Sequence, residues 1–205
     1  MKENKRKISS LTFKERTSIA GFIVLIIFFF LFLIKFIASL CLNDYFLLVN
    51  SIFTFFLFLG KSLYFIGERH CKSEKDKPIY VLFMGIMLFF GSLAFLIYWA
   101  LSFYKKTILD YSLIKVIFYC VLSFVEVSLS IIGIFYSRKH KDILLYGYKC
   151  LNLGIAFTSI AFFMISIFAY FELNAIYGIN FLSIIVSFYL IIYSLFKIKR
   201  FSKLD

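Results

Sequence analysis

Acidic residues, proline and histidine are scarce in this sequence of 205 residues. It contains 11 Asp and Glu, one Pro and two His, and charged residues of both signs make up only 17% of it. Hydrophobic residues make up 62%, whereas a soluble domain has about 45–50%. The remaining polar residues are too few to cover a water-soluble surface. This excludes a soluble enzyme and a soluble nucleic-acid-binding domain, despite the net charge of +12.

Sequence motifs of catalytic and nucleotide-binding sites are missing as well. The chain has no H-E-x-x-H, G-x-S-x-G or P-loop pattern. The two histidines, His70 and His140, stand between apolar runs rather than inside them. Glu68 and Cys71 add metal-compatible atoms near His70, but the spacing matches no recognised zinc pattern. We therefore expect no enzymatic activity, no cofactor and no metal.

The four cysteines do not form a disulfide framework. Cys71 and Cys150 are expected on or near one side of the membrane, Cys41 near the other side and Cys120 within a helix. We expect these thiols to be reduced and to serve mostly in packing.

Six apolar runs are long enough to cross a membrane as helices. About 20 residues of helix cross a hydrocarbon core of about 30 Å. The runs are apolar on all faces and do not alternate as barrel strands would. They are Ser18–Leu42, Tyr45–Gly67, Ile79–Phe103, Tyr111–Tyr136, Leu144–Tyr170 and Tyr177–Lys197. We expect an all-α fold with one six-helix transmembrane domain at residues 18–198, a basic tail at residues 1–17 and a short basic tail at residues 199–205.

The basic residues between these runs predict the orientation. The two tails (with Lys197) and the second and fourth loops together carry 17 Lys and Arg, whereas the loops of the other side carry only Lys105 and Lys106. The positive-inside rule then places both termini in the cytoplasm, in the plasma membrane of a bacterial cell. The basic tails are expected to meet anionic lipid headgroups, or to serve only in setting this orientation. The first run is about twice as long as a signal-peptide core, so we expect it to be retained.

Three even-numbered runs end in similar short sequences. Ser62–Ile66, Ser128–Ile132 and Ser194–Ile198 follow one another at a period of 66 residues. The period suggests three parallel helical hairpins, and parallel repeats are frequent in transporters. Phe, Ile, Leu and Ser are so abundant here that chance matches and equal helix lengths explain the period equally well.

Glu126 is the deepest charged residue in the predicted helices. A charge at mid-membrane costs about 2.5–3.5 kcal/mol on translocon scales, so such a residue is a candidate functional site with a partner to name. In the register of the repeat, Lys61 falls one position from Glu126, which predicts a similar depth. We therefore expect Lys61, or secondly Lys149, to pair with Glu126, although a protonated Glu126 also fits.

Structural roles explain the same residues without a functional site. Lys35, Lys61, Lys115 and Lys149 each lie within about two turns of an interface, which a long side chain can reach. Glu126 can simply hydrogen-bond between helices. Other residues that could line a weakly polar interior are Tyr119, Ser123, Asn152, Ser92, Ser128, Thr158, Ser159 and Asn180.

Two segments carry a resemblance to a known group of proteins. Phe55–Lys61 is an aromatic-rich helix segment that closes on a basic residue, and Lys149–Leu153 precedes Ala156, Thr158 and Ser159. With the basic loop between them, the second to fifth runs resemble a family of uncharacterised bacterial multi-pass membrane proteins. The family's usual Pro in the second basic loop is missing here. The resemblance implies a multi-pass topology and no particular activity.

Two functions remain open at this point. The leading hypothesis is a small-solute or ion transporter, based on the hairpin repeat and on Glu126 with a lysine partner. The alternative is a non-catalytic membrane accessory, interaction or immunity-type subunit, favoured by the short loops and the few interior polar groups. Such a subunit would bind another membrane protein or a second copy of the chain. Neither hypothesis involves nucleic acid.

Overall fold

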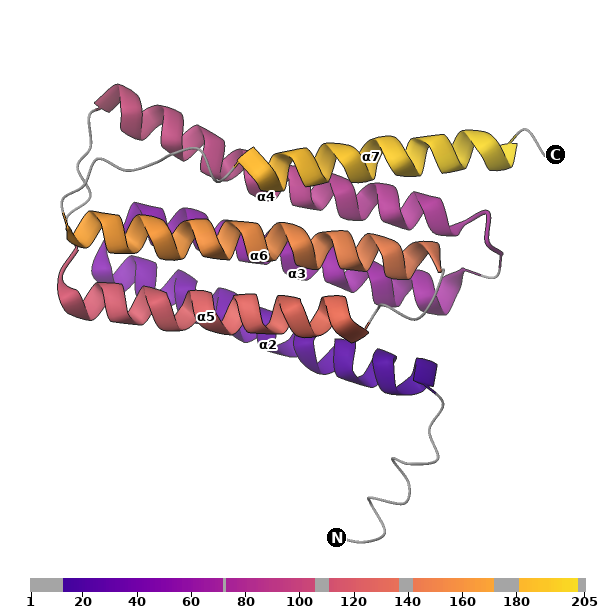
Figure 1. Cartoon of the computed structure of the whole chain (residues 1–205), viewed down its shortest axis with the longest axis horizontal. Helices are drawn as coiled ribbons and strands as arrows, with labels where there is room; N and C mark the ends of the chain where they lie inside the picture. The colour runs from indigo at the N-terminus through magenta and orange to yellow at the C-terminus, as the bar shows by residue number, and fades with distance from the viewer. Residues whose placement is uncertain (1–12, 72, 106–110, 137–141, 172–180, 203–205) are drawn as a thin grey trace, which may run out of the picture.

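The computed structural model of the chain describes residues 13–71, 73–105, 111–136, 142–171 and 181–202 (Figure 1). In these ranges every regular element is a helix and none is a strand. The helices are α2 (Phe13–Leu42), α3 (Tyr45–His70), α4 (Lys77–Lys105), α5 (Leu113–Tyr136), α6 (Ile143–Tyr170) and α7 (Phe181–Ser202). The all-α prediction is confirmed, and each helix overlaps one predicted run.

Five of these helices are long and apolar enough to span a membrane. The candidate spans are Gly21–Leu42, Tyr45–His70, Lys77–Tyr98, Leu113–Phe135 and Ile143–Tyr170. The length and composition of these helices are those of a multi-pass membrane protein. The sixth predicted run corresponds to α7, which is not among the five, so a sixth span stays a prediction. Residues 1–12, 137–141 and 203–205, which carry much of the predicted basic charge, lie outside the described residues.

Helices α3 and α6 lie at the centre of the bundle. α3 packs against α2, α4 and α6, and α6 packs in turn against α5, α4 and α7. α2 has a broad interface with α3 but touches α5 at only a few positions. Figure 1 shows that α2 begins and α7 ends at the same end of the bundle. We call this the α3–α4 end, after the connection found there, and the opposite end the α2–α3 end.

A tight turn at Asn43 and Asp44 joins α2 to α3. Asn43 has a φ of 49°, in the left-handed region that asparagine tolerates after a helix. Asp44 is the N-cap of α3, and its carboxylate accepts hydrogen bonds from the backbone N–H groups of Phe46 (3.0 Å) and Leu47 (3.1 Å). The cap satisfies backbone donors that a helix start otherwise leaves unpaired.

An acidic cap also orders the α3–α4 end. Asp142 accepts a hydrogen bond from the backbone N–H of Leu144 (2.9 Å) at the start of α6. Its second carboxylate oxygen lies 2.9 Å from Lys77 Nζ, at the start of α4. This ion pair ties the beginnings of α4 and α6 together.

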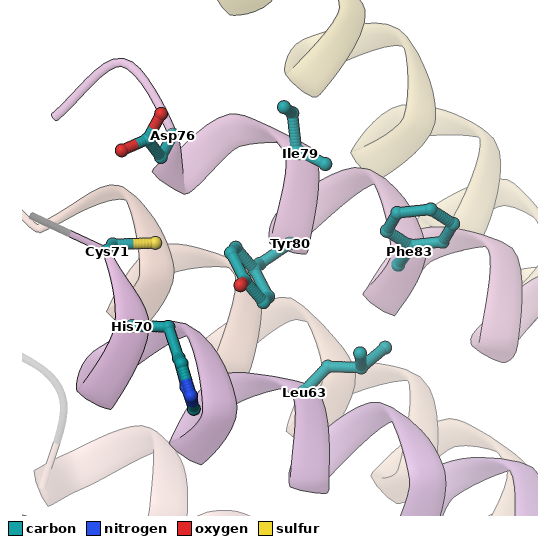
Figure 2. A pocket seen from close by; sticks show the side chains of 7 residues that line it. All are labelled: Leu63, His70, Cys71, Asp76, Ile79, Tyr80 and Phe83. Atoms are coloured by element: carbon teal, nitrogen blue, oxygen red, sulfur yellow. The ribbon is translucent and has the colours of Figure 1, made fainter. Parts of the chain in front are cut away.

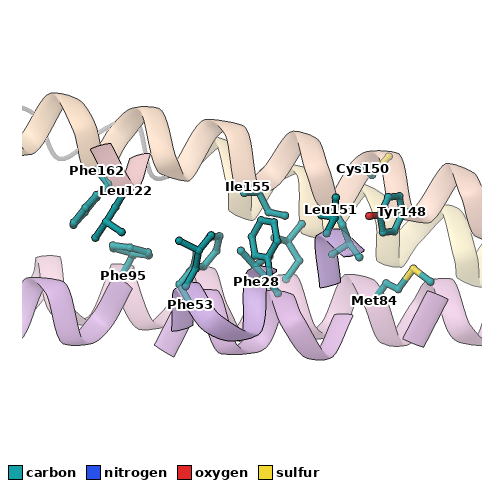
Figure 3. Packing of buried hydrophobic residues seen from close by; sticks show 14 of the residues in the cluster. Phe28, Phe53, Met84, Phe95, Leu122, Tyr148, Cys150, Leu151, Ile155 and Phe162 are labelled. Carbon is teal, nitrogen blue, oxygen red and sulfur yellow. The ribbon is translucent and has the colours of Figure 1, made fainter. Parts of the chain in front are cut away.

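The core is a continuous column of aromatic and branched side chains. Figure 3 shows part of it between the central helices, with Phe28, Phe53, Phe95, Ile155 and Phe162 among the labelled residues. Phe46 stacks on Phe162 at a centroid distance of 5.1 Å. Gly85 allows α4 and α7 to approach, because a Cβ there would lie 3.3 Å from the backbone nitrogen of Ile191. Close backbone approach at small residues is typical of membrane helix packing.

Candidate functional site

A buried ion pair joins α2 to α5 in the middle of the bundle. Lys35 Nζ lies 2.5 Å from Glu126 Oε1, and the exposed fractions of the two residues are 0% and 2%. Lys35 lies seven residues before the end of α2, and Glu126 lies near the middle of α5. A buried charged pair between apolar helices is expensive in a membrane and therefore marks a candidate site.

Polar side chains of α3 and α6 complete the contacts of this pair. Lys35 Nζ also donates to Thr54 Oγ1 (3.1 Å) and to Asn50 Oδ1. Glu126 Oε1 lies 3.2 Å from the Thr54 hydroxyl, and Oε2 accepts a hydrogen bond of 2.9 Å from Ser159. We call these five residues the Glu126 layer. Every member is buried, and they come from four different helices.

The hydrogen-bond capacity of the lysine in this layer is filled. An ammonium group has three N–H donors, and Lys35 has three acceptors, in Glu126, Thr54 and Asn50. Such saturation is what makes a buried charge tolerable, because each unpaired donor would cost free energy. The layer is thus a network of side chains from four helices in which both members of the ion pair are buried.

Lys61 forms a second site with neutral partners. Its Nζ donates to Asn152 Oδ1 at 2.6 Å and lies over the rings of Phe28 (4.2 Å from the centroid) and Tyr148 (5.0 Å). Lys61 and Asn152 are both fully buried. Asn152 Nδ2 has no hydrogen-bond partner in the described chain and packs over Gly133, where a Cβ would lie 2.3 Å from it. We call these five residues the Lys61 layer.

The two layers repeat at an interval of seven residues on each helix. On α3, for example, Thr54 belongs to the first layer and Lys61 to the second. Seven residues are two turns of helix, a rise of about 10 Å. Between the layers the same helices contribute Leu31, Leu57 and Ile155, all buried in the apolar core. On α5 this level holds Ser130, whose buried hydroxyl donates to the carbonyl oxygen of Glu126. Mainly apolar packing therefore separates the ion pair from the second lysine.

Tyr119 lies one further heptad before Glu126 on α5, toward the α2–α3 end. Its hydroxyl donates to Asp44 Oδ2 at 2.5 Å, and its ring packs on Phe162 at 5.2 Å. Tyr119 is thus hydrogen-bonded to the N-cap residue of α3 and not to the ion pair. Ser123 is buried, and its hydroxyl has no partner among the described residues.

The predicted partner of Glu126 is wrong. The sequence suggested Lys61 or Lys149, whereas the structure pairs Glu126 with Lys35. The reason is the stagger of α3 and α5: Thr54 contacts Glu126 across 72 residues of chain instead of the 66 that the repeat implied. Lys61 is therefore displaced by two turns. Lys149 is half-buried near the start of α6, outside both layers.

The remaining predicted polar residues have local roles or stay untested. Ser92 and Thr158 donate to carbonyl oxygens one turn earlier in their own helices. Asn180 and His140 lie outside the described residues. Within the described ranges, no group of three or more His, Cys, Asp and Glu is placed to hold a metal ion.

Sequence reasoning missed Asn50 and Thr54 and treated Lys35 as a lysine that reaches an interface. A signal was present: Asn50, Thr54 and Lys61 recur at intervals of four and seven residues, which places them on one stripe of α3. Such a stripe in an apolar helix indicates a polar contact with neighbouring helices.

Comparisons of the chain with family models, with curated proteins and with solved structures find no match. The functional argument therefore depends on the geometry of the two layers.

Proposed function

We propose that the protein is a transporter for a small solute or ion, whose path runs between α2, α3, α5 and α6 past the Glu126 layer. The observation that carries the proposal is the buried Lys35–Glu126 pair, fully hydrogen-bonded by side chains of four helices. Apolar residues of similar volume often stabilise a fold as well as a buried ion pair does. A function that needs the two charges accounts for their presence at this depth.

The packing of α2 supports a moving element. α2 contacts α5 at few positions, and the Lys35–Glu126 pair is the hydrogen-bonded link between them in the described residues. A solute that replaced one partner of the pair would release this link without breaking a broad interface. α2 would then be able to move away from α5, which is the kind of two-state element that alternating access requires.

The apolar packing between the layers supports an occluded arrangement. Leu31, Leu57 and Ile155 separate the Glu126 layer from Lys61, and all of them are buried. Water or solute at the ion pair would have to pass this level to reach the α3–α4 end. We propose that these residues act as the barrier of the transport path.

The proposed topology has six spans, with α7 as the sixth, and both termini in the cytoplasm of a bacterial cell. Its support is the distribution of Lys and Arg between the loops, together with the common end at which α2 begins and α7 ends (Figure 1). The α3–α4 end would then face the cytoplasm.

Flux into proteoliposomes tests this function. The probes are protons, followed with an entrapped pH-sensitive dye under an imposed membrane potential, and radiolabelled small solutes of each charge. We expect the flux through wild type to exceed that of empty liposomes for at least one probe. Lys35→Gln should lower that flux about tenfold, a barrier change of roughly 1.4 kcal/mol. Lys149→Gln should leave the flux unchanged.

Two results would contradict the proposal. Flux equal to that of empty liposomes for every probe would contradict the transporter hypothesis. A stable hetero-complex recovered from the native membrane would then favour the accessory-subunit hypothesis. Flux that Lys35→Gln and Lys149→Gln lower equally would show that the Glu126 layer has no special part in it.

A further inference from the structure

A pocket of about 420 Å³ lies between the end of α3 and the start of α4 (Figure 2). It is lined by Leu63, His70, Cys71, Asp76, Ile79, Tyr80 and Phe83. The pocket belongs to neither polar layer. Because it lies where two apolar helices end, it is at the depth of lipid headgroups in a bilayer.

One half of the pocket is an apolar wall exposed on the outside of the bundle. Ile79 and Phe83, one turn apart on α4, have exposed fractions of 46% and 45%, and Leu63 of α3 completes the wall. In Figure 2 these side chains lie on the side of the pocket away from the loop. In a membrane, these exposed apolar side chains would contact the acyl chain of a lipid.

The other half of the pocket presents the carboxylate of Asp76. Asp76 is exposed and accepts a hydrogen bond of 3.2 Å from the Ser73 hydroxyl. Within the described chain, no Lys or Arg nitrogen lies within ion-pair distance of Asp76, whereas Glu74 and Asp142 share Lys77. The pocket therefore combines an apolar wall with a carboxylate at its mouth that no Lys or Arg of the described residues neutralises.

We infer that this pocket binds a phospholipid whose headgroup carries a primary ammonium, such as phosphatidylethanolamine. The ammonium donates to the Asp76 carboxylate, and one acyl chain lies along Ile79 and Phe83. Arg69, which is exposed near the end of α3, supplies positive charge for the phosphate. Anionic lipids without an ammonium would bring a second negative charge to Asp76, so charge complementarity selects the aminophospholipid.

Native mass spectrometry of the detergent-solubilised full chain tests the site. The lipids are phosphatidylethanolamine, phosphatidylglycerol and phosphatidylcholine with identical acyl chains, and the soluble competitor is glycerophosphoethanolamine. Asp76→Asn removes the charge at the pocket, and Glu74→Gln removes a charge of the same sign from the same segment outside the pocket. Both positions are exposed, and thermal unfolding in detergent verifies that each variant is folded.

We expect wild type and Glu74→Gln to retain phosphatidylethanolamine in preference to the other two lipids. Asp76→Asn should bind it about fivefold more weakly, the upper range for an exposed ion pair. Three results would each overturn the inference. They are retention of phosphatidylglycerol equal to that of phosphatidylethanolamine, an unchanged affinity in Asp76→Asn, and competition by glycerophosphoethanolamine that is as effective as competition by the whole lipid. The site does not depend on the proposed transport function.

Discussion

Removing one partner of the Lys35–Glu126 pair should destabilise the protein more than removing both charges. Lys35→Met leaves the Glu126 carboxylate with only the hydroxyls of Thr54 and Ser159. Glu126→Gln keeps the shape of the side chain but leaves the Lys35 ammonium without a counter-charge. Breaking a buried pair from one side costs about 3–5 kcal/mol, whereas replacing both charges is often close to neutral.

The expected magnitudes follow from the saturation of the Glu126 layer. Because both members of the pair are buried, each single variant should lose about 3 kcal/mol of unfolding free energy. The double variant Lys35→Met/Glu126→Gln should lose less than either single variant, which gives a coupling free energy of at least about 3 kcal/mol. This exceeds the roughly 0.6 kcal/mol average of neutral hydrogen bonds between membrane helices, because two charges are involved.

Equilibrium unfolding in mixed micelles with increasing SDS, followed by pulse proteolysis, measures these free energies. The control cycle combines Lys35→Met with Glu74→Gln, whose carboxylate pairs with Lys77 at the exposed end of the bundle, and its coupling should be near zero. Losses that simply add in the Lys35/Glu126 double variant would refute the direct pairing. Single variants as stable as wild type would refute the buried, fully hydrogen-bonded arrangement of the pair.

Three further predictions concern other parts of the molecule. Gly133→Ala should cost about 1–3 kcal/mol of unfolding free energy, because its Cβ would lie 2.3 Å from Asn152 Nδ2 and displace that side chain; unchanged SDS unfolding would contradict this packing. Asp44→Ala removes the cap of α3 and the acceptor of Tyr119, so it should cost about 1–2 kcal/mol, and more than Tyr119→Phe in the same assay. Burial and the nearby Asp76 raise the pKa of the Cys71 thiol, so its thiolate is scarce at neutral pH. Its maleimide labelling in a variant with no other cysteine should therefore rise steadily with pH to above pH 9, and a plateau near neutral pH would contradict the raised pKa.

The fold was largely predictable because membrane helices depend on a strong and simple signal. Apolar runs such as Tyr45–Gly67 leave no alternative to a helix, and the observed α3 starts at the same residue. The ends were less certain: α3 continues to His70, because charged residues can extend a helix beyond the apolar segment. The equal spacing of the runs gave no information on the stagger between helices.

The site was only partly predictable, because the sequence does not show how the helices are staggered or which of their faces meet. Glu126 stood out as a charge within an apolar run, and the structure does place it at the centre of a polar layer. Its partner depended on which faces of α2, α3 and α5 meet, and side-chain packing decides this. Lys35 and Lys61 look alike in sequence, yet only Lys35 reaches the carboxylate.

We propose that the Glu126 layer is a transport site. The most direct measurement is the flux of Glu126→Gln relative to wild type and to Glu74→Gln, in proteoliposomes with matched protein content and for the probe that wild type moves best. We expect Glu74→Gln to match wild type and Glu126→Gln to retain about a tenth of the flux or less, because the charge that holds Lys35 is gone. Equal flux for all three proteins would contradict the claim.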